Sequence, residues 1–189
     1  MAKPKTKAPK QIKINEFFLI LANYNTKGIL LIMSKFLKYI LAIGVCFLAG
    51  GIGSLFTASA IPTWYATLNK PFFSPPNWLF GPAWTTLYTL MGISVAIIWQ
   101  KGIKSKKIRD AVYLFGIQLF LNAIWSPIFF GAKNLLLAFA VIVLMWIFIL
   151  KTILAFRKID KTASYLLYPY IAWVSFASLL NFAVWLLNK

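Results

Sequence analysis

The segment KPFFSPPNWLFGPAW, Lys70–Trp84, combines four prolines with five aromatic residues and stands directly before a long apolar run. Pro71, Pro75 and Pro76 fix φ and lack backbone N–H donors, so the segment up to that point cannot be helical. Pro82 falls in the first turn of the following apolar run, where a missing N–H costs little. The segment therefore predicts a stiff aromatic loop that leads into a helix and can fold over the end of a helix bundle as a lid.

The composition indicates an integral membrane protein. The chain has 189 residues, of which 61% are hydrophobic, only three are acidic and none is His. A soluble domain of this size cannot bury so much apolar surface. Five apolar runs have about the 20 residues that a helix needs to cross a bilayer. We therefore predict an all-α integral membrane protein with a bundle of five transmembrane helices: Leu37–Ala60, Trp78–Trp99, Ala111–Phe130, Leu135–Phe156 and Tyr165–Leu187.

The basic residues alternate between the two ends of these predicted spans. The chain up to Lys38 holds eight of the 20 Lys and Arg residues, and the four loops and the tail hold one, five, one, four and one in chain order. The positive-inside rule places the N-terminus in the cytoplasm and the lid outside. This pattern favours a bacterial inner membrane, with an organelle membrane as the alternative. It also explains the net charge of +17 without a nucleic-acid partner.

Residues 1–36 are predicted to be a basic extension outside the membrane domain, which covers residues 37–189. The Lys/Pro-rich first 13 residues are expected to be disordered. The stretch Ile14–Met33 is apolar, but polar residues and a glycine at 23–28 break it into halves too short to span. We expect an interfacial segment. A targeting sequence is the alternative, because the start is basic and the apolar core is short.

The predicted spans contain no carboxylate. Proton relays, ion-coupled pumps and carboxylate acid/base catalysis need intramembrane ionisable groups, so these functions are disfavoured. The absence of His removes the usual hydrolytic dyads and zinc motifs, and the lone Cys46 forms neither an intramolecular disulfide nor a cysteine metal cluster. We expect no metal, no resident cofactor and a binding protein rather than an enzyme.

The spans do hold amide and aromatic side chains at helical spacing. Gln118, Asn122 and Trp125 share one face of the third span, and Trp84 and Tyr88 share one face of the second. On the fifth span the same spacing joins Trp173, Ala177, Leu180 and Asn181. The amides should face the bundle interior, where they either join helices or line a pocket. Interior tryptophans beside small residues can wall a flat apolar cavity, which suggests a binder of planar or rigid apolar molecules.

Three long motifs carry a resemblance to a known family. They are WYATLNKPFFSPPNWLFGPAWTTLYTLMG (Trp64–Gly92), LNAIWSPIFFGAKN (Leu121–Asn134) and YPYIAWVSFASLLN (Tyr168–Asn181). The chain resembles the translocator protein / tryptophan-rich sensory protein (TspO/MBR) family, also called peripheral-type benzodiazepine receptors. The resemblance covers most of residues 37–187 and leaves the N-terminal extension out.

This resemblance implies a five-helix bundle with a pocket under the loop between the first two helices. It implies binding of tetrapyrroles such as protoporphyrin IX and, in some members, of cholesterol and synthetic isoquinoline or benzodiazepine ligands. A role in stress or tetrapyrrole-linked signalling or transport would follow. Matching motif positions makes these the expected ligand-binding residues: Tyr65, Pro75, Trp84, Tyr88, Asn122, Trp125, Ser126, Trp173, Ala177 and Leu180.

The sequence departs from the family in two places, and two other functions stay open. The end of the fifth span has no Tyr for the family's sterol motif, and the third span lacks the family's small-residue dimer spacing. Ala49 and Gly53, four apart on the first span, offer another surface for a homodimer. One alternative function is light-dependent degradation of protoporphyrin with Trp84 and Trp173 as electron donors. The other is a scaffold whose cavity is only a packing defect.

Overall fold

The computed structural model describes residues 14–189, and it describes side chains from residue 32 on. The chain divides into two units between Leu37 and Lys38. The helical elements, in chain order, are α1 (Ile14–Ala60), α2 (Trp64–Thr67), η1 (Asn77–Leu79), α3 (Phe80–Gln100), α4 (Lys106–Ser126), η2 (Pro127–Gly131), α5 (Leu135–Arg157), α6 (Lys161–Tyr165) and α7 (Tyr168–Leu187).

The prediction of an all-α membrane protein with five spans is confirmed. Five stretches in the described part of the chain are long and apolar enough to cross a bilayer. The first begins at Ile32 rather than Leu37, and the third begins at Lys106 rather than Ala111. The spans run over Ile32–Ala60, Asn77–Gln100, Lys106–Gly131, Leu135–Arg157 and Lys161–Leu187.

The expected break in the N-terminal apolar stretch is not observed. Helix α1 continues through residues 23–28 without interruption. None of these residues is proline, and Asn, Thr and a single Gly each cost a helix only about 1 kcal/mol or less. Polar side chains thus interrupt the hydropathy of this stretch without ending its helix. Whether the stretch lies at a membrane interface stays a prediction.

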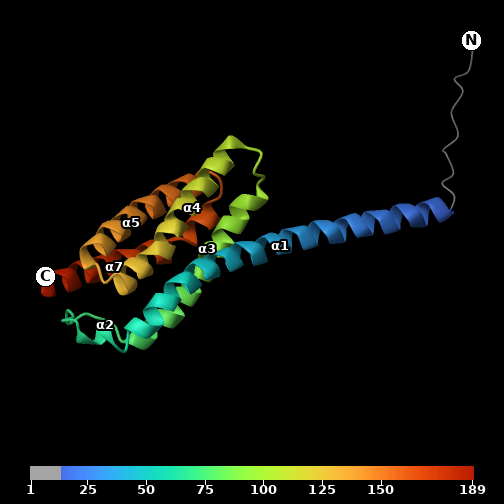
Figure 1. The fold of residues 1–189 in the computed structure, drawn as a ribbon. Coiled ribbons are helices and arrows are strands. Elements are labelled where there is room, and N and C mark those ends of the chain that lie inside the picture. Colours follow the sequence, from blue (N-terminus) through green and yellow to red (C-terminus); the bar gives the residue numbers. More distant parts are fainter. Residues whose placement is uncertain (1–13) are drawn as a thin grey trace, which may run out of the picture. The chain divides into compact units, whose positions relative to one another are not determined.

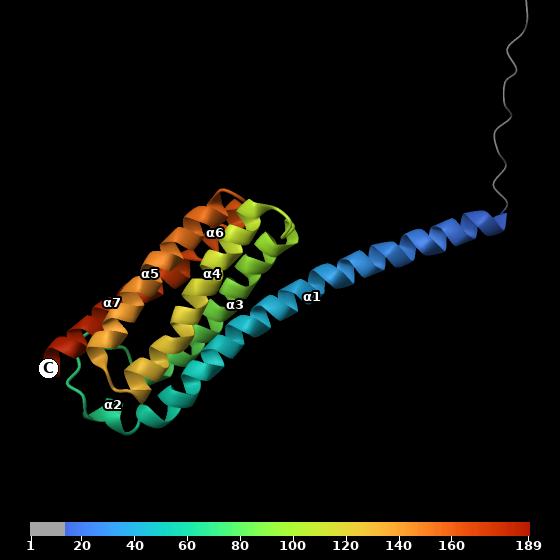
Figure 2. The same ribbon diagram turned by 45° about the horizontal axis from the view of Figure 1, so that its top comes forward.

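Residues 38–189 form a helix bundle. Helix α4 packs against α5, and α5 packs against α7 (Figures 1 and 2). Helix α2 and the C-terminus lie at one end of the bundle, here called the lid end. The α3–α4 loop and α6 lie at the opposite end (Figure 2). The core between these ends is mostly apolar and consists of one large cluster and a smaller one around Tyr65 and Phe129. Its fully buried side chains include Met91, Ile98, Met145, Phe156 and Tyr170.

The end opposite the lid carries most of the basic loop residues and is closed by polar contacts between turns. Lys101 at the end of α3 forms a 2.9 Å ion pair with Asp160, which caps α6. Lys107 donates a 2.7 Å hydrogen bond from Nζ to the carbonyl oxygen of Lys158. Because these contacts join the α3–α4 loop and the first turn of α4 to the α5–α6 turn, they fix the basic end of the bundle.

Close packing of α1 against α3 and α4 depends on glycine. A Cβ atom at Gly92 of α3 would lie 2.5 Å from Cα of Ile43, so only glycine lets the two helices approach this closely. Gly53 of α1 faces Ser126, whose Oγ would lie 3.1 Å from an added Cβ. Ala49 is 7% exposed. The pair Ala49 and Gly53 is therefore buried inside the bundle, and it is not a free surface for a homodimer as the sequence had suggested.

The lid is the connection between α1 and α3. Residues 68–76 contain no helix, as the prolines predict. The four-residue helix α2 precedes them and was not anticipated. Its residues carry no proline, so nothing prevents one helical turn there. The lid thus consists of a short helix followed by an extended, proline-stiffened strap.

Candidate ligand-binding cavity

The membrane bundle contains a cavity of about 410 Å³. Its wall comes from α1, α3, α4, η2, α5 and α7, and from Ile61, Tyr65 and Asn77 of the lid. Two of the wall residues on α1 are Gly50 and Gly53, where a Cβ atom would meet Tyr88 and Ser126. Nine of the 27 wall residues are aromatic. The aromatic wall residues are Phe47, Tyr65, Phe80, Trp84, Tyr88, Trp125, Phe129, Phe130 and Trp173.

Nine of the ten residues that sequence reasoning assigned to ligand binding lie in this one wall: Tyr65, Trp84, Tyr88, Asn122, Trp125, Ser126, Trp173, Ala177 and Leu180. The tenth, Pro75, is half-buried in the lid and does not line the cavity. Its place in the lid follows from its role in stiffening the strap. Four separate segments of the chain thus bring the motif residues together.

The cavity wall is built from aromatic rings in contact with one another. Trp84 stacks on Tyr88, with ring centroids 5.3 Å apart and an interplanar angle of 25°. Trp173 meets Phe80 edge-on at 6.0 Å. Trp125 stacks on Phe129. Such offset and edge-on contacts are the favoured geometries for aromatic pairs, so the rings support one another and hold the wall in place.

A chain of hydrogen bonds lies behind one part of the wall. The hydroxyl of Tyr88 donates to Oδ1 of Asn122 at 2.8 Å, and Nδ2 of Asn122 donates to the hydroxyl of Tyr170 at 3.2 Å. Tyr170 in turn donates to Oε1 of Gln118 at 2.9 Å. Asn122 therefore both joins helices and lines the cavity, whereas Gln118 only joins helices. Both roles expected for the buried amides thus hold for Asn122, and only the first holds for Gln118.

The indole N–H groups of two wall tryptophans differ in their partners. Nε1 of Trp125 donates to Oδ1 of Asn181 at 3.2 Å, and Asn181 donates onward to the carbonyl oxygen of Leu135. Nε1 of Trp173 is buried and has no hydrogen-bond partner among the described residues. A buried N–H without a partner costs free energy. The ring of Trp173 lines the cavity, whereas its N–H is enclosed by protein atoms.

The lid is attached to the bundle at several points. Asn188, just beyond α7, bonds both backbone groups of Asn69 in the strap. Phe73 meets Phe176 of α7 edge-on at 6.4 Å. Tyr65 packs against Phe130 and is 5% exposed, and this burial raises the pKa of its hydroxyl above the ordinary value. These contacts keep the strap seated at the end of the cavity.

Sequence reasoning missed several wall residues, mainly Gly50 and Gly53 of α1, Phe129 of η2 and Met145 of α5. The glycines belong to a visible small-residue cluster, but their orientation toward the interior depends on how α1 packs. Tyr170, which connects Asn122 to Gln118, gave no signal that set it apart from Tyr168 two residues earlier. Only the packing shows that Tyr170 is fully buried while Tyr168 is 41% exposed.

These features define a multi-pass membrane protein with a lidded aromatic cavity inside its helix bundle. The chain belongs to the TspO/MBR family, whose model matches residues 42–186. It is 47% identical over 154 residues to the tryptophan-rich protein TspO of Chlorobaculum tepidum, covering 82% of this chain and 98% of that protein.

Two further relatives extend the similarity beyond that protein. The human translocator protein is 38% identical over 135 residues, covering 71% of this chain and 80% of the relative. The tryptophan-rich sensory protein of Cereibacter sphaeroides is 39% identical over 125 residues, covering 66% and 77%. All these matches fall short of the full length of this chain.

Proposed function

We propose that the protein binds tetrapyrroles such as protoporphyrin IX, or similar flat apolar ligands, in the cavity of its helix bundle. The observation that carries this proposal is the convergence of nine motif residues from separate segments on one aromatic wall. A cavity of about 410 Å³ falls within the ~300–1,000 Å³ usual for small-molecule sites.

The wall's chemistry supports a planar apolar ligand. Trp84 and Trp173 offer ring surfaces for stacking. The names of the relatives refer to translocation and sensing in those proteins. For this chain we propose that ligand binding serves tetrapyrrole-linked signalling or transport.

Tryptophan-fluorescence quenching by protoporphyrin IX tests the proposal. The titration is done in the dark on detergent-purified protein, with wild type and a Trp84→Phe, Trp173→Phe variant. We expect saturable binding at low-micromolar levels or below in wild type and weaker binding in the variant. Weak, linear quenching that is equal in both proteins would indicate partitioning into detergent and would support the scaffold alternative.

A second candidate function is light-dependent degradation of the bound tetrapyrrole. The specific observation that favours it is the stack of Trp84 on Tyr88, because Tyr88 continues into the hydrogen-bonded chain through Asn122. Trp84 would donate an electron to the excited ligand, leaving an indole radical on Trp84 and a reduced ligand radical. Dissolved dioxygen would oxidise the ligand radical, and an added one-electron reductant would restore Trp84 for the next turnover. Illumination of the complex tests this: the double Phe variant should keep some binding and lose turnover. Full turnover in that variant would exclude the tryptophans as donors.

We also propose that the N-terminus faces the cytoplasm of a bacterial inner membrane and that the lid lies outside. The asymmetry of Lys and Arg between the two ends supports this orientation. Single cysteines introduced at Lys104 and at Thr67 in a Cys46→Ser background test it with a membrane-impermeant thiol reagent on intact cells. Labelling at position 67 and protection at position 104 are expected, and the reverse pattern would overturn the orientation.

A further inference from the structure

The lid end of the bundle carries only positive charges. Within residues 38–189, both acidic residues, Asp110 and Asp160, lie at the opposite end, where each forms an ion pair with a lysine. Three lysines, Lys70, Lys133 and Lys189, stand at the lid end. None of them forms an ion pair within the described part of the chain.

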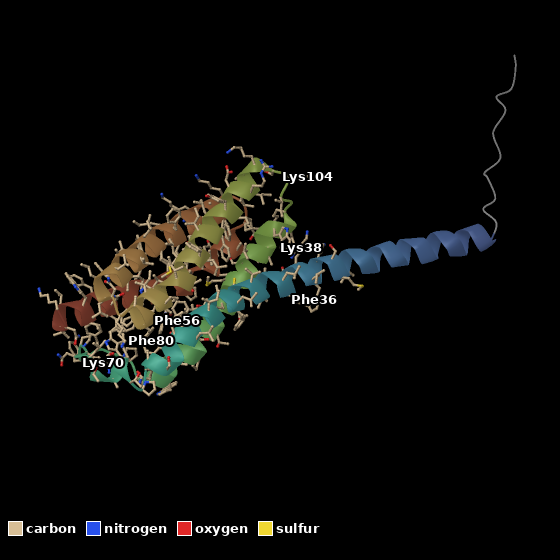
Figure 3. The ribbon with its side chains drawn as sticks, in the orientation of Figure 1. Phe36, Lys38, Phe56, Lys70, Phe80 and Lys104 are labelled. Atoms are coloured by element: carbon tan, nitrogen blue, oxygen red, sulfur yellow. The ribbon has the colours of Figure 1, made fainter. Side chains whose placement is uncertain are left out.

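Among these three, Lys70 lies beside the cavity. Its Nζ is 4.6 Å from the ring centroid of Tyr65, which is itself a wall residue. Lys70 is half-buried, whereas Lys133 and Lys189 are exposed to solvent. Figure 3 shows Lys70 at the lid end and Lys104 at the opposite end of the bundle. Lys70 is not itself a wall residue, but its Nζ lies over the ring of one, so it is a cation at the edge of the ligand space.

The positive charge of a half-buried lysine without a counter-ion is only partly stabilised by its surroundings. The face of an aromatic ring stabilises a nearby ammonium by about 0.5–2 kcal/mol. Partial burial removes part of the hydration that the ammonium would otherwise have. A carboxylate placed near Nζ would supply the missing charge, and it would do so at reduced dielectric, where the attraction is stronger than in water.

We propose that Lys70 is the counter-ion for a carboxylate on the ligand, so that the cavity selects flat apolar molecules that carry an acidic group at one edge. This inference rests on the proposed function and narrows its ligand class. The apolar body of the ligand lies against the aromatic wall. Its carboxylate lies at the lid, where Lys70 neutralises it. A neutral analogue of the same shape fills the same wall but leaves Lys70 unpaired.

Protoporphyrin IX and its dimethyl ester test this directly. They share the same ring, but the two carboxylates of the first are neutral methyl esters in the second. Both are titrated in the dark in a non-ionic detergent that contains no phosphate. Wild type should bind the diacid about tenfold more tightly than the diester, the ratio expected for a charge-assisted hydrogen bond. Lys70→Gln should weaken diacid binding about tenfold and leave diester binding unchanged.

Three further variants make the result specific. Lys70→Arg keeps the charge and should keep the preference for the diacid. Lys104→Gln removes an exposed lysine at the opposite end and should change neither affinity. Lys189→Gln removes a lysine at the lid end whose Nζ lies over Trp185, a ring outside the cavity wall, and it should also have no effect.

The outcomes separate this inference from the proposed function. If diacid and diester bind equally well to wild type, or if Lys70→Gln keeps the full preference, the proposed function stands and the role of Lys70 is excluded. If Lys70→Gln weakens both ligands equally, Lys70 acts by holding the lid and not as a counter-ion. If neither ligand binds saturably to wild type, the proposed function fails and this inference falls with it.

Discussion

The side-chain amide of Asn188 holds both backbone groups of Asn69, 119 positions earlier in the chain. Its Oδ1 accepts a 2.9 Å hydrogen bond from the Asn69 N–H, and its Nδ2 donates a 2.8 Å bond to the Asn69 carbonyl oxygen. Nδ2 also donates to the carbonyl oxygen of Val184 inside α7. A single side chain thus ties the strap of the lid to the last turn of the bundle.

The variant Asn188→Ala should release the strap without disturbing the core. It removes two hydrogen bonds to the lid, each worth about 0.5–1.5 kcal/mol net. We expect the amides of residues 68–76 to exchange hydrogen faster and a bound tetrapyrrole to dissociate roughly tenfold faster. Hydrogen–deuterium exchange and stopped-flow displacement measure the two effects. Lys189→Ala is the matched control. Equal hydrogen exchange in both variants would show that the bonds between Asn188 and Asn69 do not hold the strap.

Gly50 and Gly51 offer a paired test of the cavity wall. A Cβ atom at Gly50 would overlap the ring of Tyr88, whereas one at Gly51 would meet nothing within 4 Å. Gly50→Ala should therefore displace Tyr88, destabilise the bundle by about 1–3 kcal/mol and weaken ligand binding.

Gly51→Ala gains the same helix propensity without the clash, so it should be neutral or slightly stabilising. Thermal unfolding in detergent and fluorescence quenching compare the two variants. Equal stability and equal affinity would mean that α1 shifts to accommodate the methyl group, and that the approach of α1 to Tyr88 is not required for the cavity.

The fold could be predicted from the sequence because lipid imposes a simple rule. Every spanning segment must satisfy its backbone hydrogen bonds internally, so apolar length alone locates helices. The span at Leu135–Arg157 shows this well, since its predicted end differs by one residue. The same rule failed for α1, whose helix continues through Asn23–Gly28. Hydropathy reports where a helix meets lipid and says little about where the helix begins.

The site could be predicted only where spacing determines which side of a helix a residue occupies. Asn122 and Trp125 share a face at i, i+3, and both line the cavity. The contribution of Gly50 depends on how close α1 comes to Tyr88, which is a property of packing between helices. The two hydrogen bonds between Asn69 and Asn188 join segments that no sequence motif or spacing relates. The sequence therefore could not predict them.

Asn122 is the central member of the buried hydrogen-bonded chain, so its removal should cost more than the loss of an ordinary pair. The variant Asn122→Leu keeps the branched shape of the side chain but removes the acceptor for Tyr88 and the donor to Tyr170. Hydrogen bonds in membrane bundles average ~0.6 kcal/mol each, and an unpaired buried hydroxyl adds a further penalty. We expect a loss of about 1–2 kcal/mol in the free energy of unfolding, measured with denaturant in detergent.

The matched control for Asn122→Leu is Ser175→Ala. It removes a 2.8 Å bond from Trp146 Nε1 and the 2.8 Å bond from the Ser175 hydroxyl to the carbonyl oxygen of Ile171 in the same helix, at a partly buried position outside the cavity wall. Its cost should be at most about half that of Asn122→Leu, and ligand affinity should not change. A larger loss of stability in Ser175→Ala would show that the hydrogen-bonded side chains behind the cavity do not stabilise the fold more than an ordinary hydrogen bond does.

Asp160 at the basic end makes stability depend on pH. The hydrogen bond from Lys101 and the backbone N–H of Ala163 hold the pKa of this carboxyl below its ordinary value. The ionised form is therefore favoured in the folded state, so its stabilising contribution is complete above the unfolded pKa of 3.8 and is lost as the pH falls through the lower folded value.

Asp160→Asn keeps the side-chain oxygen that caps α6 but removes the charge. The variant should unfold at a lower temperature than wild type at pH 7, and the difference should shrink as the pH drops below 4. Thermal unfolding in detergent across this pH range measures it, with Asp110→Asn in the exposed pair with Lys106 as a control of little effect. A difference between Asp160→Asn and wild type that stays constant from pH 7 to pH 3 would mean that the charge of Asp160 does not stabilise the fold.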